Sequence, residues 1–286
     1  LEVREQTGFF NASLYTPYSI LGIETLGYEV AVQTRAMTGR FPDAVLVTHA
    51  GGGNLTGTAR GLRKAGADSS EVVAVSVDLS GLHMASDRDF NRKSFTTGHT
   101  GFSLPFTTWP DRADVPRSAA RPLRYMDRFV TVTQGEVFYA TEALATLEGL
   151  ERGPAGNTSL AAALALARDM GTEQVLVVQE TEYTGAGKHP TAQLSLARQL
   201  GIAVRRGDPR ENQPGRNIVI PEHPSQLAVV DLDLSGIRLS YLRKALAALE
   251  PGQYPSQRDI EFLAADSGAS TETINRIVEQ HHAKDR

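Results

Sequence analysis

Residues 45–59 read VLVTHAGGGNLTGTA and constrain the architecture more than any other segment of the chain. The residues before the glycines have the apolar, β-branched character of a buried strand, and those after them can form a helix. Glycine permits positive φ and close backbone approach, so the amides of Gly51–Gly53 can converge on one point. The start of a helix adds free N–H groups and the positive end of its dipole. The segment therefore predicts a binding site for a phosphate or a similar anion.

The composition is that of an ordinary globular protein. The chain has 286 residues, 41% hydrophobic and 22% charged, which suffices for one α/β domain or two lobes. A net charge of −4 gives no reason to expect nucleic acid or an anionic membrane as a partner. The sequence contains no cysteine, which excludes disulfides and thiolate chemistry, and no apolar run reaches the roughly 20 residues of a membrane span. We expect a cytoplasmic protein.

Strand-like and helix-like segments alternate over most of the sequence. The expected strands are residues 41–47, 72–77, 129–133, 174–179 and 202–205. The expected helices are residues 17–37, a helix after the glycine loop that runs through Ala65, and residues 135–150, 155–171 and 192–200. This alternation predicts an α/β fold with a mainly parallel sheet and helices on both faces.

The pattern changes beyond Pro221, where residues 224–250 and 256–280 look helical and amphipathic. We therefore expect residues 1–220 to form the anion-binding α/β region and residues 221–286 to form a C-terminal helical appendage. Residues 79–122 show no clear periodicity and are long for a connection inside a compact domain. We expect that segment to be a functional or partner-facing excursion.

The glycine loop does not match the common nucleotide-binding motifs. From Gly51 the spacing is G-x-G-x-x-x-G, one residue longer than the dinucleotide fingerprint. Gly52 and Gly57 have the spacing of a P-loop, but Thr58 stands where that motif needs lysine. A turn that needs glycine only for its geometry remains an alternative. The remaining anion to consider is the 5′-phosphate of pyridoxal phosphate.

Two further glycine-punctuated turns accompany the first. Residues 153–156 read GPAG and precede an alanine-rich helix, and residues 184–188 read TGAGK and follow the expected fourth strand. Loops that follow the carboxyl ends of parallel strands gather in one crevice. Two of the three loops directly follow expected strands, so their convergence on one cofactor is geometrically natural.

Taken together, these motifs resemble the fold type II (tryptophan synthase β-like) pyridoxal-phosphate enzymes. The resemblance covers roughly residues 15–204 and includes the Glu148-Gly149 turn. It implies that the phosphate of pyridoxal 5′-phosphate is bound by the backbone amides of Gly51, Gly52, Gly53, Asn54 and Leu55. It also implies that the Thr184 hydroxyl hydrogen-bonds the pyridine nitrogen, although a turn or capping role for Thr184 is an alternative. Glu148 could orient the cofactor or simply end a helix.

Within that superfamily, four stretches resemble the β subunits of the 2-amino-4-oxopentanoate thiolases. They are residues 49–54 (HAGGGN), 78–87 (DLSGLHMASD), 90–101 (FNRKSFTTGHTG) and 179–190 (QETEYTGAGKHP). This resemblance implies that coenzyme A cleaves 2-amino-4-oxopentanoate, an intermediate of ornithine degradation, to acetyl-CoA and alanine. It also implies a small α subunit as partner.

Two other classes of function stay open. One is another fold type II lyase or synthase, such as a threonine or cysteate synthase-like enzyme. The other is a non-catalytic subunit that keeps the fold as a binding surface.

The lysine content departs from the family pattern. In the family, the lysine that forms the Schiff base with the cofactor lies upstream of the glycine loop. Here all five lysines follow the loop, namely Lys64, Lys93, Lys188, Lys244 and Lys284. The resemblance therefore does not identify the catalytic lysine among the residues of this chain.

The N-terminus bears on the same question, because the first residue is Leu1 rather than methionine. We expect the chain to lack an N-terminal segment of the fold and the Schiff-base lysine to lie upstream of Leu1. Lys93 is a substitute candidate, with a solvent-facing or phosphate-binding role as the alternative.

The seven histidines do not form a recognisable metal or hydrolase motif. Neither H-E-x-x-H nor a G-x-S-x-G nucleophile turn is present in the sequence, so we expect no metal. His49 borders the glycine loop and is the best candidate for substrate contact. His83 and His99 lie in the long excursion and could line the mouth of the site.

Overall fold

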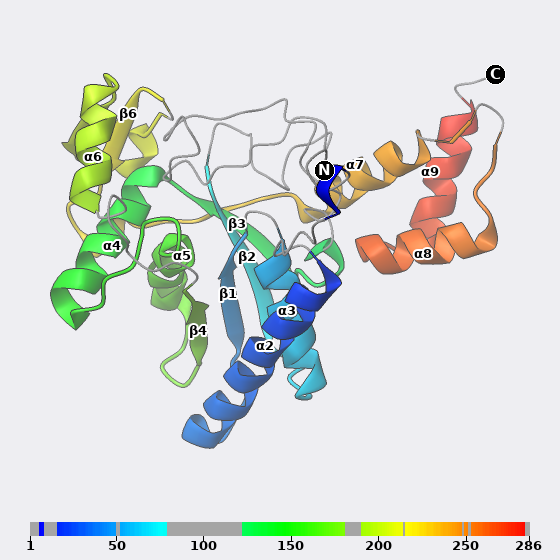
Figure 1. Ribbon diagram of the computed structural model, residues 1–286, viewed down its shortest axis with the longest axis horizontal. Helices are drawn as coiled ribbons and strands as arrows, with labels where there is room; N and C mark the ends of the chain where they lie inside the picture. Colours follow the sequence, from blue (N-terminus) through cyan, green and yellow to red (C-terminus); the bar gives the residue numbers. More distant parts are fainter. Residues whose placement is uncertain are drawn as a thin grey trace.

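The fold is described from a computed structural model of the chain, shown in Figure 1. The structure describes residues 6–8, 16–49, 52–78, 122–180, 190–213, 215–247, 249–250 and 253–283. Leu1, Gly51, Lys93, Thr184 and the excursion over residues 79–121 lie outside the described residues. The roles that the sequence predicts for these residues stay predictions. The same holds for a Schiff-base lysine upstream of Leu1.

A five-stranded sheet forms the centre of the molecule (Figure 1). Its spatial order is β4 (Leu176–Gln179), β1 (Ala44–Thr48), β2 (Glu71–Val77), β3 (Arg128–Val132) and β7 (Val230–Asp231). The first four strands are parallel, and β7 runs antiparallel to β3. The predicted mainly parallel sheet is confirmed.

Both faces of the sheet are buried. Successive side chains of a strand point to opposite faces, so each strand contributes to two cores. Val45 and Val47 of β1 belong to one core cluster, and Ala44 and Leu46 belong to another. The first cluster includes side chains of α3 (Gly53–Lys64) and α7 (Leu234–Leu246), and the second includes those of α4 (Gln134–Glu148) and α5 (Thr158–Leu166). Each fully buried valine or leucine contributes about 1.5–3 kcal/mol. Helices therefore cover both faces, as predicted.

Helix α2 (Pro17–Thr38) begins and ends where the sequence predicts. The Thr16 hydroxyl accepts a hydrogen bond from the Ser19 amide at 3.3 Å, and Pro17 occupies the first turn, where its missing N–H costs nothing. Gly39 ends the helix in the left-handed conformation, with φ of 80°.

Glycines allow α2 to lie directly against α3 (Figure 1). A Cβ atom on Gly27 would lie 2.1 Å from the Thr58 carbonyl oxygen, and one on Gly61 would lie 2.1 Å from the Glu24 carbonyl oxygen. Any larger residue at these positions would push the helices apart. The close contact fixes where α3 lies, and with it the position of its first turn.

A second, two-stranded sheet lies beside the first. It pairs β5 (Ala203–Arg206) with β6 (Asn217–Ile220) in parallel, and α6 (Pro190–Gln199) packs on it. The sequence predicts β5 and α6, but it did not predict β6. This strand has four residues, of which Ile218, Val219 and Ile220 are β-branched and buried, and it pairs with β5.

The C-terminal region departs from the two predicted long helices. Instead of one helix over residues 224–250, the chain forms a 3₁₀ turn (Pro224–Gln226), then β7, then α7. The second predicted helix is two helices, α8 (Gln257–Ser267) and α9 (Thr271–Ala283), because Gly268 ends α8 with φ of 74°. None of the described helices is long and apolar enough to cross a membrane.

Residues of α7, α8 and α9 share a core cluster with β1 and α3. The appendage beyond residue 220 is thus packed on the α/β region through apolar contacts. The domain boundary itself stays a prediction.

Candidate functional site

The described part of the glycine loop enters α3 at the carboxyl end of β1. Gly52 is the residue before the helix and has φ of 82°, a left-handed conformation that side chains disfavour. Its carbonyl oxygen accepts hydrogen bonds from the Thr56 amide at 3.0 Å and the Thr56 hydroxyl at 2.6 Å. The amides of Gly53, Asn54 and Leu55 then have no acceptor within the helix. The first turn of α3 also carries no acidic side chain, so an anion meets no repelling charge from it.

Burial limits what each residue of this turn can offer a ligand. Gly52, Gly53 and Leu55 are buried, whereas Asn54 is half-buried. The Leu55 side chain belongs to the core cluster, so only the Leu55 amide can face a ligand. Asn54 can offer both its amide N–H and its polar side chain.

The second glycine turn reaches the same edge of the sheet. The Thr48 hydroxyl at the end of β1 donates to the Gly156 carbonyl oxygen at 3.3 Å and accepts from the Ser159 amide at 3.1 Å. The Ser159 hydroxyl donates to the Gln179 carbonyl oxygen at the end of β4, at 3.0 Å. Val47 and Gln179 are register partners in the parallel pair β1–β4. The structure thus brings the turn before α5 and the start of the third loop beside the end of β1.

A buried hydrogen bond also ties α3 to β4. The Thr58 hydroxyl donates to Gln179 Oε1 at 2.8 Å, and both side chains are buried. Buried polar groups are stable only when they are paired, so this contact fixes the relative position of the two elements.

Asn157, two positions before Ser159, contacts Thr141 and Glu180. Its side-chain amide lies 3.1 Å from the Thr141 hydroxyl and, with its nitrogen turned toward Glu180, 3.0 and 3.2 Å from the two carboxylate oxygens. No sequence motif had indicated the five side chains that join these elements, Thr48, Thr58, Asn157, Ser159 and Gln179. The available signal was the polar residue that closes each of the apolar strands β1 and β4.

His49 follows β1 directly and is 2% exposed. Its ring meets the Phe129 ring edge-on, with centroids 5.3 Å apart and planes at 72°. Neither ring nitrogen has a hydrogen-bond partner among the described residues. Burial lowers the pKa of the imidazole to about 3, so the ring is uncharged at neutral pH.

Glu148 lies away from these contacts. It is the exposed last residue of α4, and Gly149 ends that helix with φ of 66°. The structure supports the helix-end role of the Glu148-Gly149 turn. At the other end of α4, Glu136 closes a capping box with Thr133 and accepts from the Ala228 amide at 2.7 Å. Burial raises the pKa of Glu136, whose contacts are structural.

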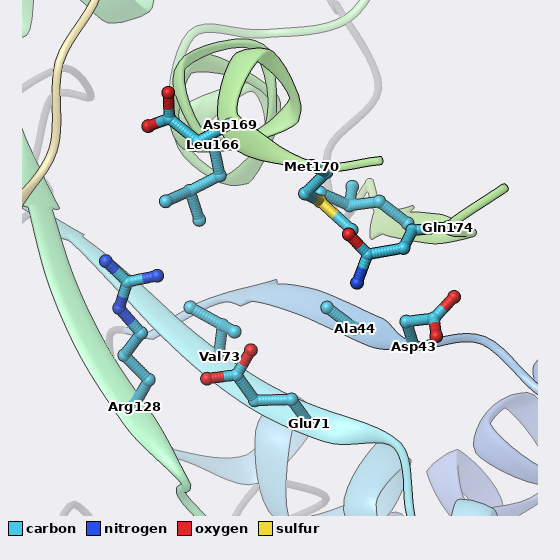
Figure 2. Close-up of a pocket in the computed structure, with 10 residues that line it drawn as sticks. Asp43, Ala44, Glu71, Val73, Arg128, Leu166, Asp169, Met170 and Gln174 are labelled. Carbon is cyan, nitrogen blue, oxygen red and sulfur yellow. The ribbon is translucent and has the colours of Figure 1, made fainter. Parts of the chain in front are cut away.

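A pocket of about 370 Å³ lies at the opposite, amino edge of the sheet (Figure 2). It is lined by Asp43, Ala44, Glu71, Val73, Arg128, Leu166, Asp169, Met170, Gln174 and Leu176. Arg128 donates to the Asp231 carboxylate, its Nη2 at 2.8 Å. Ligands of open parallel sheets bind at the carboxyl ends of strands, so this pocket is not where the cofactor is expected. Among the described residues no group of three potential metal ligands occurs.

Comparison with known proteins gives the family. Residues 1–181 match the family described as pyridoxal-phosphate dependent enzyme. A 2-amino-4-ketopentanoate thiolase beta subunit from an unknown prokaryotic organism is 62% identical over 274 residues, covering 96% of this chain and 58% of that protein. A protein of the same name from Acetoanaerobium sticklandii is 59% identical over 284 residues, covering 98% of this chain and 59% of that protein. The chain therefore spans under two thirds of the length of these relatives.

Solved structures agree on the fold. The processed form of threonine deaminase isoform 2 from Solanum lycopersicum aligns with a TM-score of 0.50 at 17% identity, over 65% of this chain and 52% of that one. At this identity the similarity concerns the fold alone. The resemblance to fold type II enzymes inferred from the sequence is confirmed.

Proposed function

Because the chain belongs to the family of pyridoxal-phosphate dependent enzymes, we propose that it carries the cofactor-binding part of a 2-amino-4-oxopentanoate thiolase. The reaction consumes coenzyme A and yields acetyl-CoA and alanine. The C3–C4 bond breaks, the thiol sulfur bonds to C4, and C3 takes up a proton. The support is the name shared by the two relatives, which match nearly the whole of this chain.

The observation that carries the cofactor assignment is the first turn of α3. It presents a left-handed glycine, consecutive amides without helical acceptors and no acidic side chain, a donor set that suits a phosphate. We propose that the amides of residues 51–55 hold the phosphate and that Thr184 contacts the pyridine nitrogen. When bound, pyridoxal phosphate supplies an electron sink that stabilises negative charge on the substrate.

The buried hydroxyl contacts serve to orient this donor set. The hydroxyls of Ser159 in α5 and Thr58 in α3 donate to Gln179 at the carboxyl end of β4, at 3.0 and 2.8 Å. The Ser159 amide also donates to the Thr48 hydroxyl at the end of β1. A fixed set of main-chain donors binds an anion without first having to reorganise. The third loop, which leaves from β4, is therefore anchored at its start to the same support as the first loop.

We propose further that the lysine linked covalently to the cofactor lies upstream of Leu1 in the full-length protein. The support is the order of residues within this chain, where no lysine precedes the glycine loop. Lys93 is the alternative candidate within the chain. Mass spectrometry of the borohydride-reduced holoenzyme would identify the modified lysine, and a cofactor-modified Lys93 would overturn the upstream assignment.

The functional enzyme would also contain a small α subunit and act in the cytoplasm, where coenzyme A and free amino acids meet. Residues 1–220 would bind the cofactor, and residues 221–286 would be the helical appendage.

The test is an assay of the full-length protein with its α subunit. Pyridoxal phosphate, coenzyme A and 2-amino-4-oxopentanoate should give acetyl-CoA and alanine in equal amounts, and omission of coenzyme A should stop both. Release of ammonia or a 2-oxo acid without coenzyme A would support a lyase instead. Absence of any visible absorbance from bound cofactor would support a non-catalytic subunit.

A further inference from the structure

His49 is a buried polar side chain that the proposed function has not yet used. Its two ring nitrogens are buried and lack partners among the described residues. A buried donor or acceptor without a partner costs about 1–3 kcal/mol. A leucine or phenylalanine would fill the same apolar surroundings without that cost. The histidine at position 49 therefore lowers the unfolding free energy relative to an apolar residue of similar size.

The backbone of His49 is held firmly at the carboxyl edge of the sheet. Its amide donates to the Val75 carbonyl oxygen at 2.7 Å, and its own carbonyl oxygen accepts from the Ser76 hydroxyl at 2.6 Å. It precedes Gly52, the residue that opens α3, by three positions. The strand alternation places its side chain on the same face of the sheet as Val47, the face that α3 covers.

The chemistry of an uncharged imidazole restricts what it can bind. One nitrogen donates a hydrogen bond and the other accepts one. A buried carboxylate or ammonium would need a compensating charge or several donors, which one neutral ring does not give. An uncharged carbonyl oxygen needs only a single donor.

We propose that His49 donates a hydrogen bond to the uncharged 4-oxo group of the amino-acid substrate and so selects 4-oxo amino acids. This inference rests on the proposed function, because it assumes that the substrate binds at the carboxyl edge of the sheet beside α3. His49 is then a specificity-determining residue, while the cofactor and the charged groups of the substrate are bound elsewhere.

The test compares two ligands that differ in the 4-oxo oxygen. The holoenzyme is titrated with 2-amino-4-oxopentanoate and with 2-aminopentanoate in the absence of coenzyme A, and the change in cofactor absorbance gives each Kd. The wild type should prefer the oxo ligand by about tenfold, which is the net value of one hydrogen bond. His49→Leu should bind both ligands within about twofold of each other, with a raised Tm in the ligand-free protein. His49→Gln keeps a donor and should retain part of the preference.

Phe129→Leu serves as the control, because it disturbs the packing of the His49 ring without removing a donor. It should lower the Tm and keep the preference for the oxo ligand. An unchanged preference in His49→Leu would overturn the inference, and so would an equal loss in Phe129→Leu. If His49→Leu does not fold, the ratio of the two Kd values in His49→Gln is compared with the same ratio in the wild type. A wild type that binds no cofactor would instead overturn the proposed function.

Discussion

The two edges of the central sheet differ in the kind of polar group that they present. At the carboxyl edge, the donors are main-chain amides of α3, supported by uncharged hydroxyl and amide side chains, and the Glu180 carboxylate lies beside Asn157. At the amino edge, the pocket carries carboxylates of Asp43, Glu71 and Asp169, and the one guanidinium, of Arg128, is paired with Asp231. The amides in the first turn of α3 therefore suit an anion better than the carboxylate-lined pocket does. The two edges lie at opposite ends of the strands and are therefore separated by the length of the strands.

The largest effect is expected from a charge placed in the α3 turn. Gly52→Asp puts a carboxylate beside the proposed phosphate, and like charges 4 Å apart repel by about 4 kcal/mol at an effective dielectric constant of 20. Pyridoxal phosphate binding should weaken by about a thousandfold. Cofactor absorbance after equilibrium dialysis measures the change.

Two variants separate charge from backbone strain in that experiment. Gly39→Asp introduces the same side chain at another left-handed glycine, which has φ of 80° and open space around it. Gly52→Asn keeps the shape of the aspartate without its charge. If Gly39→Asp or Gly52→Asn lost the cofactor to the same degree, electrostatic repulsion would not be the cause.

A smaller effect is expected from the buried contact between α3 and β4. Thr58→Val keeps the side-chain shape but leaves Gln179 Oε1 without its donor, which costs about 1–3 kcal/mol of unfolding free energy. Urea denaturation measures this loss, and cofactor affinity should fall as well because α3 is no longer fixed to β4. Thr38→Val removes an exposed hydroxyl hydrogen bond at a helix end and should change stability little. Equal effects of the two substitutions would contradict the supporting role of Thr58.

The buried imidazole predicts that acid destabilises the native protein. The pKa of His49 is about 3 in the native state and 6.5 in the unfolded chain. Below pH 6.5 the unfolded chain binds a proton that the native state refuses, so the unfolding free energy falls as the pH falls toward 3. The loss between pH 6.5 and pH 5 is on the order of 2 kcal/mol.

Urea denaturation of the wild type and His49→Leu at pH 6.5 and pH 5 measures this contribution. The wild type should lose more stability than the variant over the interval, by the amount given above. Parallel losses in the two proteins would show that another group is responsible.

The smallest effect is expected at the amino edge. Glu71→Gln removes one carboxylate from the pocket there, and its side chain has no hydrogen bond or ion pair that would be left incomplete within the described part of the chain. Stability should change by no more than about 0.5 kcal/mol, and cofactor affinity should stay within about twofold. A large loss of cofactor binding would mean that the two edges do not differ as described.

Local patterns predicted most of the fold. The valine-rich β2, the capped start of α2 and the glycine that opens α3 each carry a signal within a few residues. The strands β6 and β7 have four and two residues and exist through pairing with distant segments. The run Ile218-Val219-Ile220 in β6 is a local strand signal that was overlooked, whereas the two residues of β7 carry none.

The site was predicted only in its outline. The motif at residues 51–55 marked a turn and a helix start, and the structure shows Gly52 and α3 there. The hydrogen bonds of Thr48 with Ser159 and of Thr58 with Gln179 join residues 111 and 121 positions apart. The burial of His49 likewise depends on Phe129, which is contributed by another strand. These features arise from tertiary packing.

The most direct measurement is a crystal structure of the full-length protein with pyridoxal phosphate. Phosphate oxygens should lie within hydrogen-bonding distance of the amides of residues 51–55. A phosphate bound instead by residues 184–188, or at the amino edge of the sheet, with the α3 turn free of ligand, would contradict the account.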